Sequence, residues 1–89
     1  MPVVLIPPPY RGPTQGEAEI ETSGASIIDC LKQVEQQSPG FLSLVLDDGG
    51  GIHRYVKLFV NEEQVDSESL DVPVSGDDRI QVLAAIAGG

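Results

Sequence analysis

The chain has 89 residues, enough for one small domain, and its 40% hydrophobic content is sufficient for a globular core. Fourteen acidic residues against five basic ones give a formal net charge of −9, which would repel nucleic-acid phosphates, and the sequence has no basic patch to attract them. The single cysteine excludes an intramolecular disulfide, and the opening apolar run is too short for a secretory signal or a membrane span. We therefore expect a cytoplasmic protein, monomeric when free, whose partners are neutral or basic proteins.

Two strands are expected at the start of the chain. The first, residues 3–6, is an apolar run that the prolines at 7–9 end. The second, residues 17–21, alternates acidic and apolar residues, which places Ala18 and Ile20 toward the core and the glutamates toward water. Together they predict a hairpin whose loop spans residues 7–16.

One helix is expected to follow, over residues 26–37. Ser26 is placed to cap it, and Asp29 suits both a capping box and the positive end of the helix dipole. Apolar residues recur at helical spacing on one side: Ile27, Leu31 and Val34, with Cys30 beside them. The sequence Ser-Pro-Gly at 38–40 ends the helix, and the apolar run 41–46 fits either a short strand or a turn of helix.

Two further strands and a short strand-like segment around Val65 complete the pattern. Residues 55–60 alternate, with Val56, Leu58 and Val60 toward the core and Tyr55, Lys57 and Phe59 on the other side. In residues 79–83, Ile80 and Val82 return to the core. This order predicts a small α+β domain, residues 1–83, in which one main helix covers one face of the sheet and the other face stays open.

Residues 84–89, Ala-Ala-Ile-Ala-Gly-Gly, are expected to form a flexible C-terminal tail. Glycine loses more backbone freedom on ordering than any other residue, so a terminal pair of glycines favours a mobile end. Such a tail can enter a narrow slot of another protein and present its carboxylate there. The alternative is a frayed end of small residues with no function.

No catalytic or metal site can be assembled from the sequence. His53 has no metal-ligand partner at a recognisable spacing, and Cys30 lies within the apolar stripe of the helix, where a structural thiol is expected. The glycines at 49–51 lack the lysine and the following helix of a phosphate-binding loop. We therefore expect a protein that is not an enzyme and that acts through its tail and a partner.

The order of the elements, with the terminal Gly-Gly, resembles that of the β-grasp sulfur carriers ThiS and MoaD, which share the ubiquitin fold. This resemblance implies a β-grasp domain with a mixed four- to five-stranded sheet and one main helix packed on one face. Two stretches of the chain carry the more specific part of the resemblance. Residues 53–65, HRYVKLFVNEEQV, are particularly similar to the CysO type of MoaD-like carrier, which is associated with cysteine biosynthesis. Residues 76–83, GDDRIQVL, followed by AAIAGG, are similar to it as well. One difference is Ala84, where carriers of this group often have proline.

The resemblance implies that an activating enzyme of the MoeB or ThiF type uses ATP and magnesium to adenylate the Gly89 carboxylate. Sulfur transfer then gives a thiocarboxylate, a sulfide donor for a synthase that makes cysteine, a cofactor or a sulfur-containing metabolite. A metalloprotease or a sulfurtransferase is a further implied partner, and the carrier itself binds no cofactor. The slot of the activating enzyme would recognise Ile86, Ala87 and Gly88. Two alternatives are a ubiquitin-like modifier joined to lysines through Gly89 and a non-catalytic binding module.

Phe59 and Leu83 are the candidate partner-binding residues. Alternation sends Phe59 to the sheet face away from the helix, and in a β-grasp sheet the final strand lies beside it and sends Leu83 to the same face. Exposed apolar side chains near a reactive terminus indicate a binding site, although isolated apolar residues are also common on surfaces. Acidic residues around the patch are expected to meet basic side chains of the activating enzyme.

Overall fold

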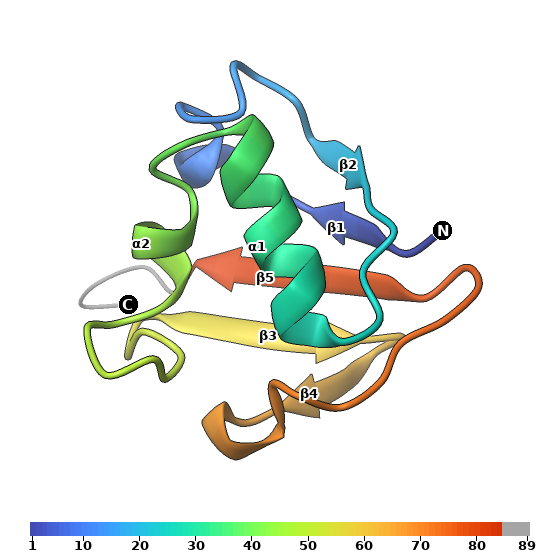
Figure 1. Cartoon of the computed structure of the whole chain (residues 1–89). Coiled ribbons are helices and arrows are strands. Elements are labelled where there is room, and N and C mark those ends of the chain that lie inside the picture. Colours follow the sequence, from blue (N-terminus) through green and yellow to red (C-terminus); the bar gives the residue numbers. More distant parts are fainter. Residues whose placement is uncertain (85–89) are drawn as a thin grey trace.

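The computed structural model describes residues 1–84 as a five-stranded mixed sheet with one long helix on one side (Figure 1). The strands are β1 (Val3–Leu5), β2 (Glu19–Glu21), β3 (Val56–Val60), β4 (Glu63–Val65) and β5 (Arg79–Ala84). The helices are α1 (Ile27–Gln37) and α2 (Leu42–Val45), with two 3-10 turns, η1 (Pro8–Tyr10) and η2 (Ser67–Ser69). The order in the sheet is β2-β1-β5-β3-β4, in which β1 and β5 are parallel and the other neighbours antiparallel. The predicted mixed sheet with one main helix is confirmed.

Helix α1 begins at the predicted position because Ser26 caps it. The Asp29 backbone N–H donates to Ser26 Oγ at 3.2 Å, which satisfies one of the free donors of the first turn. The predicted apolar stripe is buried: Ile27, Cys30, Leu31 and Val34. Gly24 lies so close to this turn that an added Cβ would stand 2.7 Å from the Cys30 nitrogen. Only glycine therefore lets the entering chain approach the helix this closely.

The apolar run 41–46, which the sequence left open between strand and helix, forms the single turn α2. Gly40, with φ of +102°, redirects the chain after α1. The Glu35 carboxylate then accepts the backbone N–H groups of Gly40 at 3.2 Å and Leu42 at 2.7 Å. Phe41 and Val45 are completely buried. The side chain that stabilises the start of α2 thus comes from the preceding helix.

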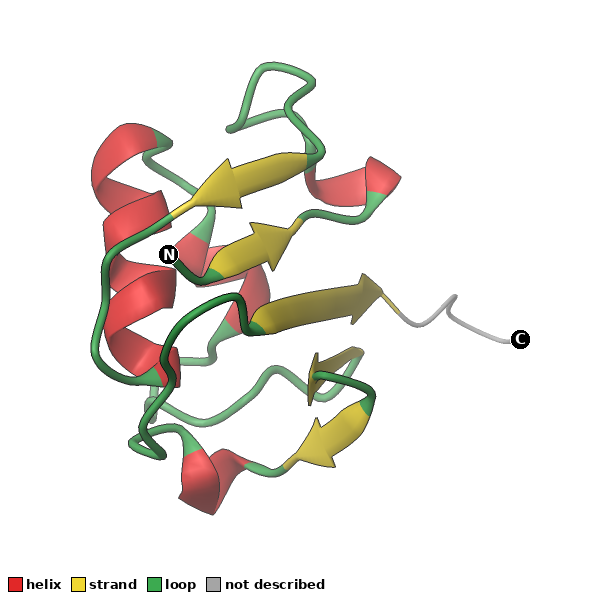
Figure 2. Cartoon of the chain, turned by 90° about the vertical axis from the view of Figure 1, so that its right-hand side faces the viewer, coloured by secondary structure: helices red, strands yellow, loops and turns green. Residues whose placement is uncertain are grey.

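The hydrophobic core lies between α1 and the sheet, and Figure 2 shows α1 to one side of the strands. The middle strand is β5, and its buried residues Ile80 and Val82 alternate with exposed ones. Strand β2 is two residues shorter at its start than predicted, because regular pairing with β1 begins only at Glu19. Ile20 is buried as expected, whereas Ala18 is half-buried.

The chain between β4 and β5 closes the core beside the first turn of α1. The backbone N–H groups of Ile27 and Ile28 donate to the carbonyls of Val72 at 3.1 Å and Leu70 at 2.8 Å. These bonds satisfy two further free donors at the start of the helix. Leu70 and Val74 are both buried. The segment 70–74 is therefore held against α1 by both hydrogen bonds and apolar contacts.

Candidate functional site

Strand β5 leads to the predicted tail, and its exposed side chains define the sheet face opposite to α1. Ile80 and Val82 are buried on the helix side, whereas Arg79, Gln81 and Leu83 are exposed on the other side. We call the sheet surface away from α1 the open face. Its alternating residues on the three central strands are Val3, Leu5, Lys57, Phe59, Arg79, Gln81 and Leu83. Leu83 keeps 39% of its surface exposed and is the most accessible large apolar side chain among these seven residues.

Phe59 also lies on the open face, but it is half-buried rather than exposed as expected. The register places it opposite Gln81 on β5 and opposite Gln64 on β4, so it has a long side chain on either side. Leu83 lies two residues beyond Gln81, which makes Phe59 and Leu83 diagonal neighbours about 7–8 Å apart. The two residues thus form one apolar patch in which Leu83 is the better exposed member.

The charged residue closest to Leu83 in the register is basic, contrary to the expectation of acidic surroundings. Lys57 is the direct cross-strand partner of Leu83. The acidic residues of this face, Glu19 and Glu21, lie on the edge strand β2. The Glu19 carboxylate lies 3.7 Å from the Arg79 guanidinium, but both side chains are more than half exposed, so this pair stabilises the fold little. The apolar patch therefore borders on a positive charge.

Further exposed side chains lie at the end of the sheet where β5 finishes. Ala84 pairs with Val56, and the three residues before Val56 are His53, Arg54 and Tyr55. Tyr55 is 43% exposed, and the Arg54 guanidinium lies 5.0 Å from the centre of its ring. The His53 ring centre is 5.7 Å from that of Tyr55. A cation–π contact thus positions an aromatic ring and a positive charge beside the end of β5.

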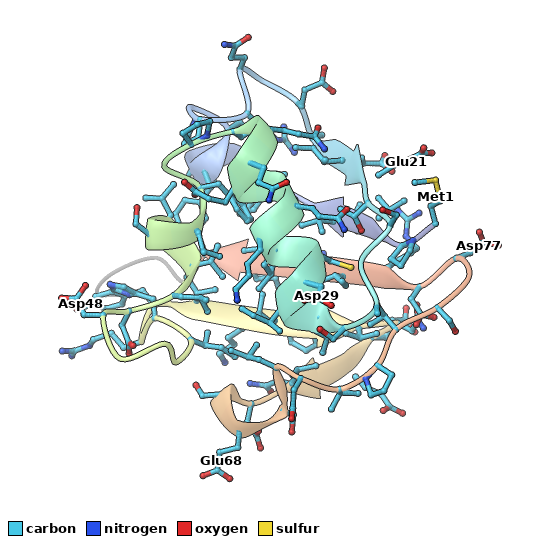
Figure 3. All side chains as sticks on the ribbon, viewed as in Figure 1. Met1, Glu21, Asp29, Asp48, Glu68 and Asp77 are labelled. Carbon is cyan, nitrogen blue, oxygen red and sulfur yellow. The ribbon has the colours of Figure 1, made fainter. Side chains whose placement is uncertain are left out.

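Sequence reasoning did not single out Tyr55 and Arg54, which the structure places beside the end of β5. The available signal was a basic and an aromatic residue directly before the strand that pairs with β5. The labelled carboxylates of Glu21, Asp48, Glu68 and Asp77 lie at the rim of the molecule, whereas that of Asp29 lies beside the start of α1 (Figure 3).

The residues assigned to recognition and chemistry in the tail lie outside the described residues. These are Ile86, Ala87, Gly88 and Gly89. Within the described part, β5 continues to Ala84, one residue beyond the predicted boundary between domain and tail. Leu83 and Tyr55 are therefore the exposed apolar side chains nearest to the start of the predicted tail.

Cys30 and His53 have structural roles in the described part of the chain. Cys30 has no solvent exposure, and the His53 backbone N–H donates to the Val45 carbonyl at 2.8 Å. His53 Nδ1 accepts the Tyr55 backbone N–H at 3.4 Å. Among residues 1–84, no group of three or more His, Cys, Asp and Glu side chains could hold a metal ion. Over that same range, no helix has the length and apolar character that crossing a membrane requires.

Comparison with known proteins assigns the chain to a family. The profile of the ThiS family matches residues 4–89. The chain belongs to the ThiS family. Within the family it is similar to the sulfur carrier protein CysO of Mycobacterium tuberculosis. The two are 30% identical over 89 residues, which cover 97% of this chain and 96% of the relative.

Solved structures confirm the predicted β-grasp fold of this ThiS-family member. The chain matches one from the BexX/CysO complex of Amycolatopsis orientalis with a TM-score of 0.90 and 31% identity, over 100% of both chains. It matches M. tuberculosis CysO with a TM-score of 0.88 and 27% identity, over 97% of this chain and 100% of that one. Small archaeal modifier protein 1 of Methanosarcina acetivorans gives a TM-score of 0.81 at 20% identity, covering 99% and 95% of the two chains. This last likeness concerns the fold alone.

Proposed function

We propose that this ThiS-family protein carries sulfur on its C-terminal carboxylate. A free carboxylate is unreactive toward sulfur nucleophiles, so an activating enzyme of the MoeB or ThiF type must first adenylate it, using ATP and magnesium. The Gly89 carboxylate attacks the α-phosphorus of ATP, and pyrophosphate leaves, which gives the acyl-adenylate. A hydrosulfide equivalent then attacks the carbonyl carbon and displaces AMP, which leaves a thiocarboxylate. A sulfur-accepting synthase uses this thiocarboxylate as its sulfide donor.

The observation that carries the proposal is that the family match runs through residue 89 and so includes Gly88 and Gly89. The position of β5 supports it, because this central strand, paired with β1 and β3, leads to those residues. The relatives named CysO are sulfur carriers, and one similar chain comes from a complex of CysO with BexX. We infer that a partner enzyme docks on the open face and receives the tail.

In this proposal the chain supplies recognition and a carboxylate, whereas the partners supply the catalytic groups. Leu83 makes the main apolar contact with the activating enzyme, and Phe59 borders it. Lys57, the cross-strand partner of Leu83, fits an acidic group on the enzyme surface. Burial of Cys30 is consistent with a persulfide that forms on a partner. A cytoplasmic location fits the free thiol.

The alternative of a ubiquitin-like modifier joined to lysines through Gly89 is not favoured. The curated relative at 30% identity is a sulfur carrier, whereas the likeness to small archaeal modifier protein 1, at 20% identity, concerns the fold alone. A non-catalytic binding module is likewise not favoured, because it does not explain a family match that includes the terminal glycines.

Intact-mass spectrometry of the full chain, incubated with the activating enzyme, ATP and sulfide, tests the proposal. The wild-type chain is expected to gain the mass difference of one oxygen replaced by sulfur. Deletion of Gly89, or Gly88→Val, should prevent adenylation while leaving the thermal melt unchanged. A series of species heavier by whole protein masses would indicate conjugation to lysines instead. Normal adenylation of the chain without Gly89 would contradict the sulfur-carrier proposal.

A further inference from the structure

A groove of about 400 Å³ lies at the end of β3 that is remote from Ala84. We call it the 60–74 groove, after the residues that form most of its walls. It is lined by apolar residues that include Val60, Val65 and Val72, and by the acidic residues Glu63 and Asp66. Val72 keeps 45% of its surface exposed, more than Leu83 on the open face. The residues that line the groove include none of the predicted tail and none of the seven named for the open face.

One wall of the groove is the segment 70–74, which the first turn of α1 holds in place. The Ile27 N–H donates to the Val72 carbonyl at 3.1 Å, and the Val74 N–H donates to the Ala25 carbonyl at 3.0 Å. Pro73 forms an isolated bridge with Ser26. The backbone on both sides of Val72 is thus fixed before any partner arrives.

The other wall is the β3–β4 hairpin, which a side-chain network fixes to the start of β5. The turn residues Asn61 and Glu62 have φ of +49° and +77°, as in the tight hairpin turns that asparagine favours. Asn61 Nδ2 donates to Asp78 Oδ1 at 2.9 Å, and Asn61 Oδ1 accepts the Arg79 N–H at 3.0 Å. Since both walls are held by hydrogen bonds, binding in the groove requires little ordering of this chain.

The surroundings of the groove carry uncompensated negative charge. No lysine or arginine occurs between Lys57 and Arg79, a stretch with seven acidic residues: Glu62, Glu63, Asp66, Glu68, Asp71, Asp77 and Asp78. In Figure 3 the side chains of Glu68 and Asp77 extend outward from the lower and right-hand margins of the molecule. On the open face, by contrast, Lys57 is paired with Leu83. The two surfaces therefore suit partners of opposite charge.

We propose that the 60–74 groove binds a short extended segment of a partner protein in which aliphatic side chains are flanked by lysine or arginine. The aliphatic side chains pack against Val60, Val65 and Val72, and the cations pair with Glu63 and Asp66. The five residues of β3 separate the groove from the end of β5 by about 13 Å of strand. The segment can therefore stay bound while the tail is engaged elsewhere. This inference goes beyond the proposed function and does not depend on it.

An NMR titration of the full chain with the synthetic peptide KKKVVVKKK at low salt tests the proposal. Saturable amide shifts are expected at residues 60–66, at residues 69–72, at Val74 and at Ile27. The peptide KKKGGGKKK, which keeps the charge and lacks the aliphatic side chains, should bind about tenfold more weakly. Equal binding of the two peptides would show that general attraction to the acidic surface replaces docking in the groove. Shifts of equal size at the acidic residues 17–21, which lie outside the groove, would show the same. Absence of saturable binding would overturn the proposal.

Two pairs of variants separate the groove from the rest of the surface. Val72→Ala and Glu63→Lys should each weaken binding of KKKVVVKKK about fivefold, through lost apolar contact and reversed charge respectively. Leu83→Ala removes an exposed aliphatic side chain from the open face, and Glu21→Lys reverses a charge on the other edge strand. Both controls should bind within about twofold of the wild type, because they are remote from the groove. Equal weakening by a variant and its matched control would overturn the assignment.

Discussion

Leu83→Ala is expected to weaken docking of the activating enzyme without unfolding the chain. Complete burial of a leucine side chain contributes about 1.5–3 kcal/mol. In the free chain 39% of the Leu83 surface is still exposed. Covering that part on docking should therefore contribute about 1 kcal/mol, which corresponds to a factor of about five in Kd.

The assay is a calorimetric titration of the variant with the activating enzyme, beside a thermal melt. Leu83 lies outside the core and its cross-strand partner Lys57 is also exposed, so the free energy of unfolding should change by less than about 0.5 kcal/mol. Val72→Ala, a similarly exposed aliphatic residue on the 60–74 groove, should retain the wild-type Kd. Ile80→Ala, on the same strand but buried, should lose about 2–5 kcal/mol of stability and so shows the effect of a core substitution.

An unchanged Kd for Leu83→Ala would remove this part of the open face from the interface. Equal weakening by Val72→Ala would show that the loss does not depend on the open face. A large drop in Tm for Leu83→Ala would mean that the side chain contributes to the core. Phe59→Ala is a less direct test, because Phe59 is half-buried and its removal also lowers stability.

Three further predictions concern the stability of the fold. Gly24→Ala should lower the free energy of unfolding in urea by about 1–3 kcal/mol, because the new Cβ would stand 2.7 Å from the Cys30 nitrogen; an unchanged midpoint would contradict this close approach. Cys30→Ala should cost about 1–2 kcal/mol while sulfur loading, measured by intact mass, persists; lost loading with an intact fold would mean that Cys30 carries sulfur. The Ser75 backbone N–H, followed by the Asn61 amide, holds the pKa of Asp78 below its usual 3.8. The stabilising contribution of Asp78 is therefore present above that pH and lost as the pH falls through the lowered pKa. Asp78→Asn should accordingly reduce the loss of unfolding free energy at acidic pH. An unaltered decrease at acidic pH would refute the assignment.

Local patterns in the sequence were sufficient to predict α1 and the faces of β3 and β5. Ser26 and Asp29 mark the start of α1, because the capping bond joins residues only three apart. Alternation separates Ile80 and Val82 from Leu83 by the two-residue period of a strand. The terminal glycines, adjacent in the chain, indicated a tail that presents its carboxylate, whereas the sulfur chemistry was implied by the resemblance to known carriers.

The folded structure was needed wherever residues far apart in the chain determine the environment. The Glu35 carboxylate binds the N–H of Leu42 and so resolves α2 as a helix, a contact that hydrophobic periodicity does not encode. Phe59 is half-buried because the register brings Gln64 and Gln81 to either side of it.

The sequence by itself thus determined α1, the strands and the face that each residue of β3 and β5 occupies, and its resemblance to known carriers suggested the class of chemistry. Tertiary structure alone decided that Lys57 is the neighbour of Leu83 and that Val60 and Val72 form one groove. The physical reason is that strand order and register arise from contacts between distant residues, whereas capping and periodicity arise within a few residues of each other.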